Sequence, residues 1–114
     1  MLKGKVVYVV ITGANKSKDV KILLDYLKAE GATCFLMPTA TSCSIIDLRT
    51  VEDYPIKRDY TFNRSDSINE RIPEEDVIVV APCTFNTFSK IANGIADNYP
   101  LSIIHAAIGY GKYI

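Results

Sequence analysis

The 114-residue sequence has no tryptophan, one histidine, three cysteines and no excess of charge of either sign. Basic and acidic residues number 13 each, so nothing indicates a nucleic-acid or acidic membrane partner. Cys34, Cys43 and Cys83 lack Cys-x-x-Cys spacing, which argues against a disulfide framework and a structural zinc site. No apolar run approaches the roughly 18 residues that cross a bilayer. The start lacks a small-residue cleavage site, so we expect a cytoplasmic protein.

Three apolar runs have the composition of strands buried on both faces, which is typical of a parallel sheet. They span residues 6–11, 32–37 and 76–81. Helical patterns alternate with them, over residues 17–31, 39–48, 88–98 and 101–107. In the third helix, Phe88, Ile91 and Ile95 are expected on one apolar face. The alternation predicts a single α/β domain over residues 1–114 with a doubly wound parallel sheet.

Two segments complete the prediction. Residues 49–73 are polar and irregular, and we expect only an edge strand within 49–60 and a helical turn at 67–71. Residues 112–114 resemble the start of a further strand.

Small and polar residues follow each of the three predicted strands. Because ligands bind beyond the carboxyl ends of parallel strands, these loops are the candidate ligand site. A glycine allows close backbone approach, a helix start offers free N–H groups to a phosphate, and hydroxyls and amides can bond a heteroaromatic ring. The candidate cofactor-binding residues are Gly13, Asn15 and Ser17 in the first loop, Thr39 and Thr41 in the second, and Thr84, Asn86 and Thr87 in the third.

The third loop and its helix resemble a known family. Residues 82–87 read Pro-Cys-Thr-Phe-Asn-Thr, and residues 90–98 read Lys-Ile-Ala-Asn-Gly-Ile-Ala-Asp-Asn. They are similar to the Pro-Ala-Ser-Ala-Asn-Thr motif and following helix of homo-oligomeric flavin-containing cysteine decarboxylases, which include phosphopantothenoylcysteine decarboxylase. The resemblance implies FMN as cofactor, a flavodoxin-like, Rossmann-like three-layer sandwich, and a homo-oligomer built from trimers. It also implies a small-molecule or peptide cysteine substrate, and a chain truncated at its C-terminus relative to the family.

The sequence departs from the family pattern where the decarboxylases carry their catalytic groups. Residues 67–70 contain no histidine, and the family's downstream Pro-x-Met-Asn motif would lie beyond Ile114. His105, on the last predicted helix, is not expected to replace the family histidine. Cys34 is expected in the core and Cys83 as a small packing residue. Flavin binding therefore carries over from the family, and no catalytic residue is assigned.

Two other interpretations remain open. A flavodoxin-like electron-transfer module would also bind FMN, but flavodoxins are usually acidic and place Trp or Tyr beside the ring, where this chain offers Phe85. A response-regulator receiver would need an aspartate at the end of the third strand, where Ala81 and Pro82 stand.

Overall fold

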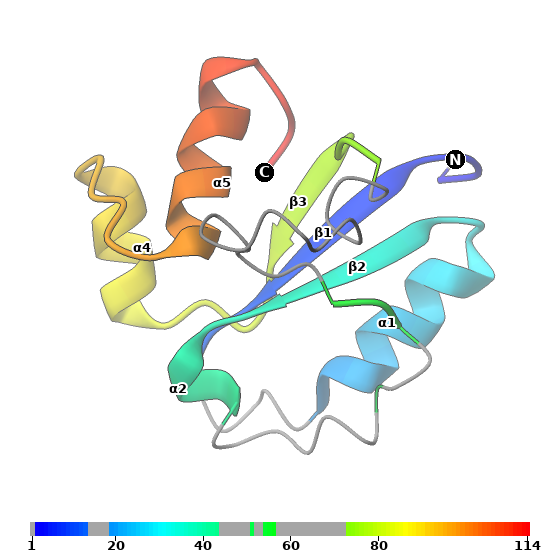
Figure 1. Ribbon diagram of the computed structural model, residues 1–114. Coiled ribbons are helices and arrows are strands. Elements are labelled where there is room, and N and C mark those ends of the chain that lie inside the picture. The colour runs from blue at the N-terminus through cyan, green and yellow to red at the C-terminus, as the bar shows by residue number, and fades with distance from the viewer. Residues whose placement is uncertain (1, 14–18, 44–50, 52–53, 57–72) are drawn as a thin grey trace, which may run out of the picture.

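The computed structural model describes residues 2–13, 19–43, 51, 54–56 and 73–114 (Figure 1). The order of elements is β1 (Val6–Ile11), α1 (Val20–Ala29), β2 (Thr33–Pro38), α2 (Ala40–Cys43), β3 (Val77–Val80), α4 (Phe85–Ala92) and α5 (Tyr99–Gly109). The three strands form a parallel sheet in the order β2-β1-β3, with Val9 opposite Leu36 on one side and Val79 on the other. The predicted α/β class with a parallel sheet is confirmed.

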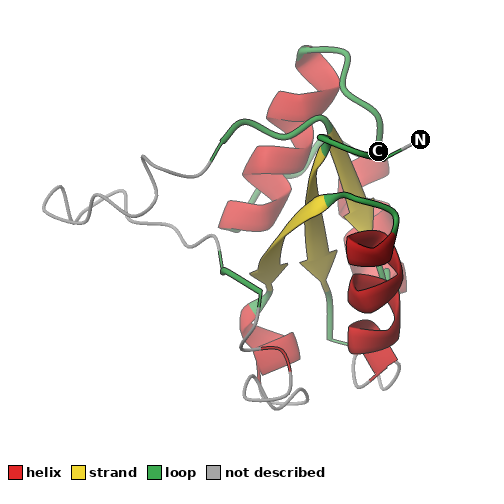
Figure 2. Ribbon diagram, turned by 90° about the vertical axis from the view of Figure 1, so that its right-hand side faces the viewer, coloured by secondary structure: helices red, strands yellow, loops and turns green. Residues whose placement is uncertain are grey.

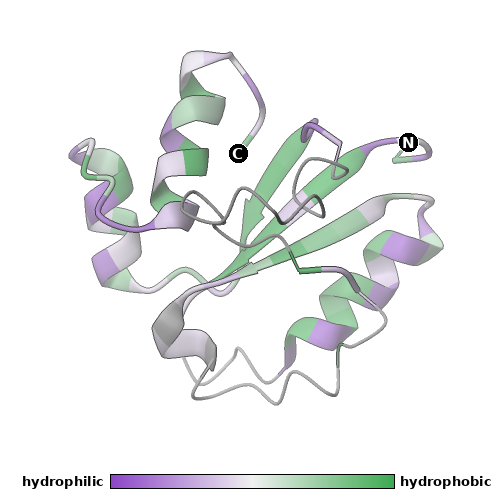
Figure 3. Ribbon diagram, viewed as in Figure 1, coloured by the Kyte–Doolittle hydropathy of each residue, from purple (hydrophilic) through white to green (hydrophobic). Residues whose placement is uncertain are grey.

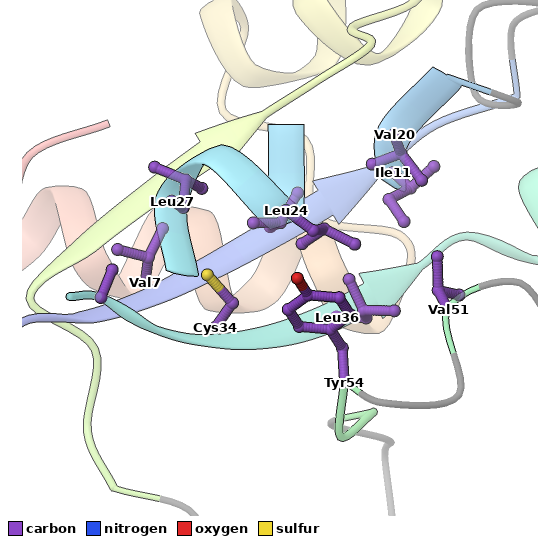
Figure 4. Packing of buried hydrophobic residues seen from close by; sticks show 11 residues of the cluster. Val7, Ile11, Val20, Leu24, Leu27, Cys34, Leu36, Val51 and Tyr54 are labelled. Atoms are coloured by element: carbon purple, nitrogen blue, oxygen red, sulfur yellow. The ribbon is translucent and has the colours of Figure 1, made fainter. Parts of the chain in front are cut away.

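Helices cover both faces of the sheet (Figure 2), as the doubly wound prediction requires. Alternate residues of β1 point to opposite faces, so one strand supplies two cores. Val7, Val9 and Ile11 pack with α1 through Leu24 and Leu27 (Figure 4).

On the opposite face, Tyr8 and Val10 pack with Leu101 and Ile104 of α5. Five of the six residues of β1 are buried, and the strands are hydrophobic along their length (Figure 3). Burial on both faces explains why the strand sequence is a continuous apolar run rather than an alternating one.

Several element boundaries differ from the prediction. The helix at residues 88–98 begins earlier and ends at Ala92, because Gly94 adopts a positive φ of 72° just after it. Ile95 therefore lies outside α4. The last helix starts at Tyr99, where the Asn98 side chain accepts a hydrogen bond from the Leu101 N–H. Gly31, with a φ of 90°, follows α1 as predicted.

Two short pairings match the predicted further strands. Ile56 forms a parallel bridge with Leu36, and Tyr113 forms one with Val77. The predicted helix start at residues 17–18, helical residues 44–48 and the turn at 67–71 lie outside the described residues. Within the described part of the chain, no helix has both the length and the apolar content needed to cross a bilayer.

Candidate functional site

The loops that follow the three strands meet at one edge of the sheet and surround a cavity of about 320 Å³. Six of the eight predicted cofactor-binding residues line it: Gly13, Thr39, Thr41, Thr84, Asn86 and Thr87. Parallel strands bring their carboxyl ends to the same edge, so residues 70 positions apart in the chain become neighbours. The other two candidates, Asn15 and Ser17, lie outside the described residues and stay predictions.

The first two loops touch at Gly13. A Cβ atom on Gly13 would lie 2.3 Å from Thr41 Cγ2 and 2.8 Å from Thr41 Cβ, closer than real contacts allow. Gly13 does not have a positive φ, so its backbone conformation does not require a glycine. What requires a glycine is the close approach of Thr41. The absence of a side chain therefore lets the second loop close against the first.

Hydrogen bonds within the second loop hold Thr39 in place. Its N–H donates to Ile11 O at 2.9 Å, which ties the loop to the end of β1. Its hydroxyl accepts from the Ser42 N–H at 3.2 Å, and the Ser42 hydroxyl donates to Thr39 O at 2.8 Å. Ser42 is fully buried, so this turn is anchored from inside the protein.

In the third loop, Thr84 caps α4. Its hydroxyl oxygen accepts from the Thr87 N–H at 3.2 Å and also pairs with the Thr87 hydroxyl at 3.0 Å. This bond satisfies one of the N–H groups that a helix start leaves unpaired. A threonine hydroxyl has one donor and two acceptor positions, so the pair keeps capacity for a ligand.

Two further lining residues, Lys90 and Asn98, were not among the predicted site residues. Lys90 follows Thr87 by three positions and Asn86 by four, so these side chains share one face of α4. This spacing could have identified Lys90 as a site residue from the sequence. The helix was instead interpreted by its apolar face. The Lys90 ammonium forms an ion pair with Asp97 at 2.8 Å. Asn98 enters the lining because it caps α5 beside the cavity.

Cys34, Cys83 and His105 are not among the residues that line the cavity. Cys34 is buried in the core, as predicted. Cys83 is exposed rather than a packing residue, and partial desolvation raises the pKa of its thiol, which disfavours the reactive thiolate. His105 Nε2 lies 3.1 Å from Ile95 O. Phe85, considered as a ring neighbour, is 85% exposed.

A cavity at the carboxyl ends of a parallel sheet, lined by hydroxyls and amides, is typical of α/β domains that bind small polar molecules. The family model described as Flavoprotein matches residues 1–114, and the chain belongs to this family. It is 34% identical over 100 residues to the flavin prenyltransferase UbiX of Methanothermobacter thermautotrophicus, covering 82% of this chain and 52% of that protein.

Several solved structures share the fold. The FMN binding protein AtHal3 has a TM-score of 0.73 at 24% identity, covering 91% of this chain and 60% of that one. A PPC decarboxylase mutant complexed with pantothenoylaminoethenethiol has a TM-score of 0.70 at 24% identity, covering 90% and 60%. The chain thus spans about half the length of the curated relative it matches. These findings confirm the predicted family and its flavodoxin-like fold.

The lining residues fit a flavin, the cofactor of this family. The cavity volume of about 320 Å³ falls at the lower end of the roughly 300–1,000 Å³ usual for small-molecule sites. Threonine hydroxyls and the Asn86 amide can bond ring carbonyls, ring nitrogens and ribityl hydroxyls. The Lys90 ammonium is suited to an anionic group.

Proposed function

We propose that this chain is an FMN-binding flavoprotein whose cofactor is held by the three loops beyond β1, β2 and β3. The observation that carries the proposal is the convergence of Gly13, Thr39, Thr84 and Asn86 on one cavity. Each of these residues is also one that the sequence alone predicts as a cofactor contact. When bound, FMN would supply the electron-accepting chemistry, and the protein would supply orientation and electrostatics. FMN is preferred among flavins because AtHal3, which shares the fold, binds it.

Direct titration tests the proposal. The purified protein, freed of any co-purifying flavin by denaturation and refolding, would be titrated with FMN, riboflavin and FAD. Quenching of flavin fluorescence and the shift of the flavin absorption bands report binding. We expect saturable binding with one FMN per chain and a preference for FMN. A protein that takes up none of the three flavins contradicts the proposal.

Replacing Asn86 with alanine should weaken FMN binding by about tenfold, because a side chain that lines the cavity loses its amide. Asn93→Ala is the matched control. Asn93 caps the other end of the same helix, bonds Ser89 O through its amide, and does not line the cavity. Its replacement should leave FMN affinity unchanged. Equal affinities for Asn86→Ala and the wild type would remove Asn86 from the site.

Flavin prenyl transfer is a second candidate, favoured by the 34% identity to flavin prenyltransferase UbiX. Cysteine decarboxylation draws support from fold alone, at 24% identity. An electron-transfer module would bind FMN without altering it. Mass spectrometry distinguishes prenyl transfer from the other two activities. The protein is incubated with reduced FMN and a prenyl phosphate, and only a transferase increases the mass of the released flavin by a prenyl group. Carbon dioxide release from a cysteine-terminated peptide tests the decarboxylase.

We further propose that the chain forms a homo-oligomer, a trimer or a multiple of trimers, through α4. This helix contributes no buried residue, and its Phe85 and Phe88 are 85% and 63% exposed. Large apolar side chains left open on an amphipathic helix indicate a contact surface. Because α4 also lines the cavity, a second copy seated here would help enclose the ligand. Light scattering on the eluted protein gives the subunit number, and a monomer at micromolar concentration contradicts the proposal.

A further inference from the structure

Thr12 joins the loop after β1 to the loop after β3, although it does not line the cavity. Its side chain is 1% exposed. The hydroxyl donates to Pro82 O at 2.5 Å and accepts from the Thr84 N–H at 2.9 Å. The Thr12 N–H also points to Pro82 O, at 3.4 Å. One buried hydroxyl therefore bonds two backbone groups of a segment that lies about 70 positions further along the chain.

We propose that Thr12 is a positioning residue for the flavin site, setting the separation of its first and third loops. The inference rests on the proposed function, because it concerns the same cavity. Thr12 directly precedes Gly13, whose backbone lies against Thr41. The Thr12 hydroxyl also accepts from the N–H of Thr84, whose own hydroxyl caps α4. Through these contacts the hydroxyl fixes the start of the helix that carries Asn86, Thr87 and Lys90.

The role depends on the hydroxyl and not on the shape of the side chain. Valine has nearly the shape of threonine but offers neither a donor nor an acceptor, so Thr12→Val removes a partner from both Pro82 O and the Thr84 N–H. Pro82 O then keeps only the longer bond from the Thr12 N–H, at 3.4 Å, while the partly buried Thr84 N–H loses the hydroxyl that accepts from it. Such a loss is costly, so we expect this part of the third loop to move toward water. Thr12→Ser keeps both hydrogen bonds. Thr12→Cys keeps only a weak donor and a weak acceptor.

Tyr8→Phe is the matched control. Tyr8 is also on β1 and buried, and its hydroxyl donates to a proline carbonyl, Pro73 O, at 2.6 Å. That bond anchors the segment before β3, whereas the cavity lies beyond the other end of that strand. Loss of the Tyr8 hydroxyl should therefore destabilise the protein as Thr12→Val does, but leave the flavin loops in place.

The test combines FMN affinity with amide hydrogen exchange of the ligand-free protein, followed by NMR. For Thr12→Val we expect FMN affinity to fall by about tenfold and the Thr84 amide to exchange about tenfold faster. Thr12→Ser should match the wild type in both, and Thr12→Cys should fall between. Tyr8→Phe should keep both values despite a lower Tm. If Thr12→Val does not fold, Thr12→Ser and Thr12→Cys are compared instead. The positioning role then requires weaker FMN binding and faster Thr84 exchange in Thr12→Cys than in Thr12→Ser.

Each outcome has one meaning. Equal losses of FMN affinity in Thr12→Val and Tyr8→Phe would overturn the positioning role, because the effect would then follow stability alone. Fast Thr84 exchange with unchanged FMN affinity would overturn it as well. A wild-type protein that binds no flavin would refute the proposed function instead, and Thr84 exchange would still show whether Thr12 holds the two loops together.

Discussion

Replacing Gly13 with alanine is expected to lower FMN affinity at least about tenfold, equivalent to roughly 1.4 kcal/mol. The new Cβ would lie 2.3 Å from Thr41 Cγ2 and 2.8 Å from Thr41 Cβ. Rotation of the Thr41 side chain can move Cγ2, but Cβ moves only with the backbone. The loop after β2 must therefore shift away from the loop after β1, which changes the cavity that both line. Fluorescence titration with FMN measures the loss.

The size of the Thr41 side chain provides the decisive check on this result. In the double variant Gly13→Ala, Thr41→Gly, both clashing atoms are absent, so affinity should recover part of the loss relative to Gly13→Ala. Gly109→Ala is the control substitution, since a Cβ there meets nothing within 4 Å and the φ is not positive. If the double variant binds FMN no better than Gly13→Ala, the contact with Thr41 is not the cause.

Replacing Ile104 with alanine is expected to reduce the free energy of unfolding by about 3 kcal/mol. Ile104 is fully buried on α5, in the core formed with Tyr8, Phe35 and Ile78. Truncation loses the transfer free energy of three carbon atoms and leaves a cavity that a sheet packed on both faces cannot readily close. Urea denaturation followed by circular dichroism measures the change, as a lower midpoint with an unchanged slope.

Ile108 on the same helix gives the comparison. Its side chain is 50% exposed, and Ile108→Ala should change stability by no more than about 0.5 kcal/mol. Alanine also has the higher helix propensity, which offsets the small loss of contact. Similar losses at both positions would mean that α5 does not cover the second face of the sheet as described.

The strands were predictable because a parallel strand covered on both faces has a distinctive sequence. The run at residues 6–11 contains no charged residue and five β-branched ones, as expected for a strand that is covered on both faces and paired on both sides. The ends of the helices were harder to predict from the sequence. The apolar sequence through Ile95 favoured a longer helix, but the positive φ at Gly94 ends α4 first. Local backbone conformation overrode the periodic pattern.

Most of the described cavity lining could be predicted, because Gly13 and Thr39 lie just after strands and Asn86 lies in the first turn of the helix that follows β3. Thr12 could not be assigned in this way. Its importance comes from hydrogen bonds to a segment 70 residues away, and these exist only once the loops have met. Lys90 was hidden for a different reason, since its helix was interpreted by its apolar face and not by its polar one.

The exposed surface of α4 has a thermodynamic consequence. Asn86, Thr87 and Lys90 face the cavity, while Phe85 and Phe88 on the same helix are open to contact from another molecule. If a second copy of the chain packs against α4, subunit contact and cofactor binding depend on the same helix. Linkage then requires reciprocity: whatever factor assembly adds to FMN affinity, bound FMN must add to the association constant of the subunits. Apoprotein and holoprotein would then differ in how readily they dissociate on dilution.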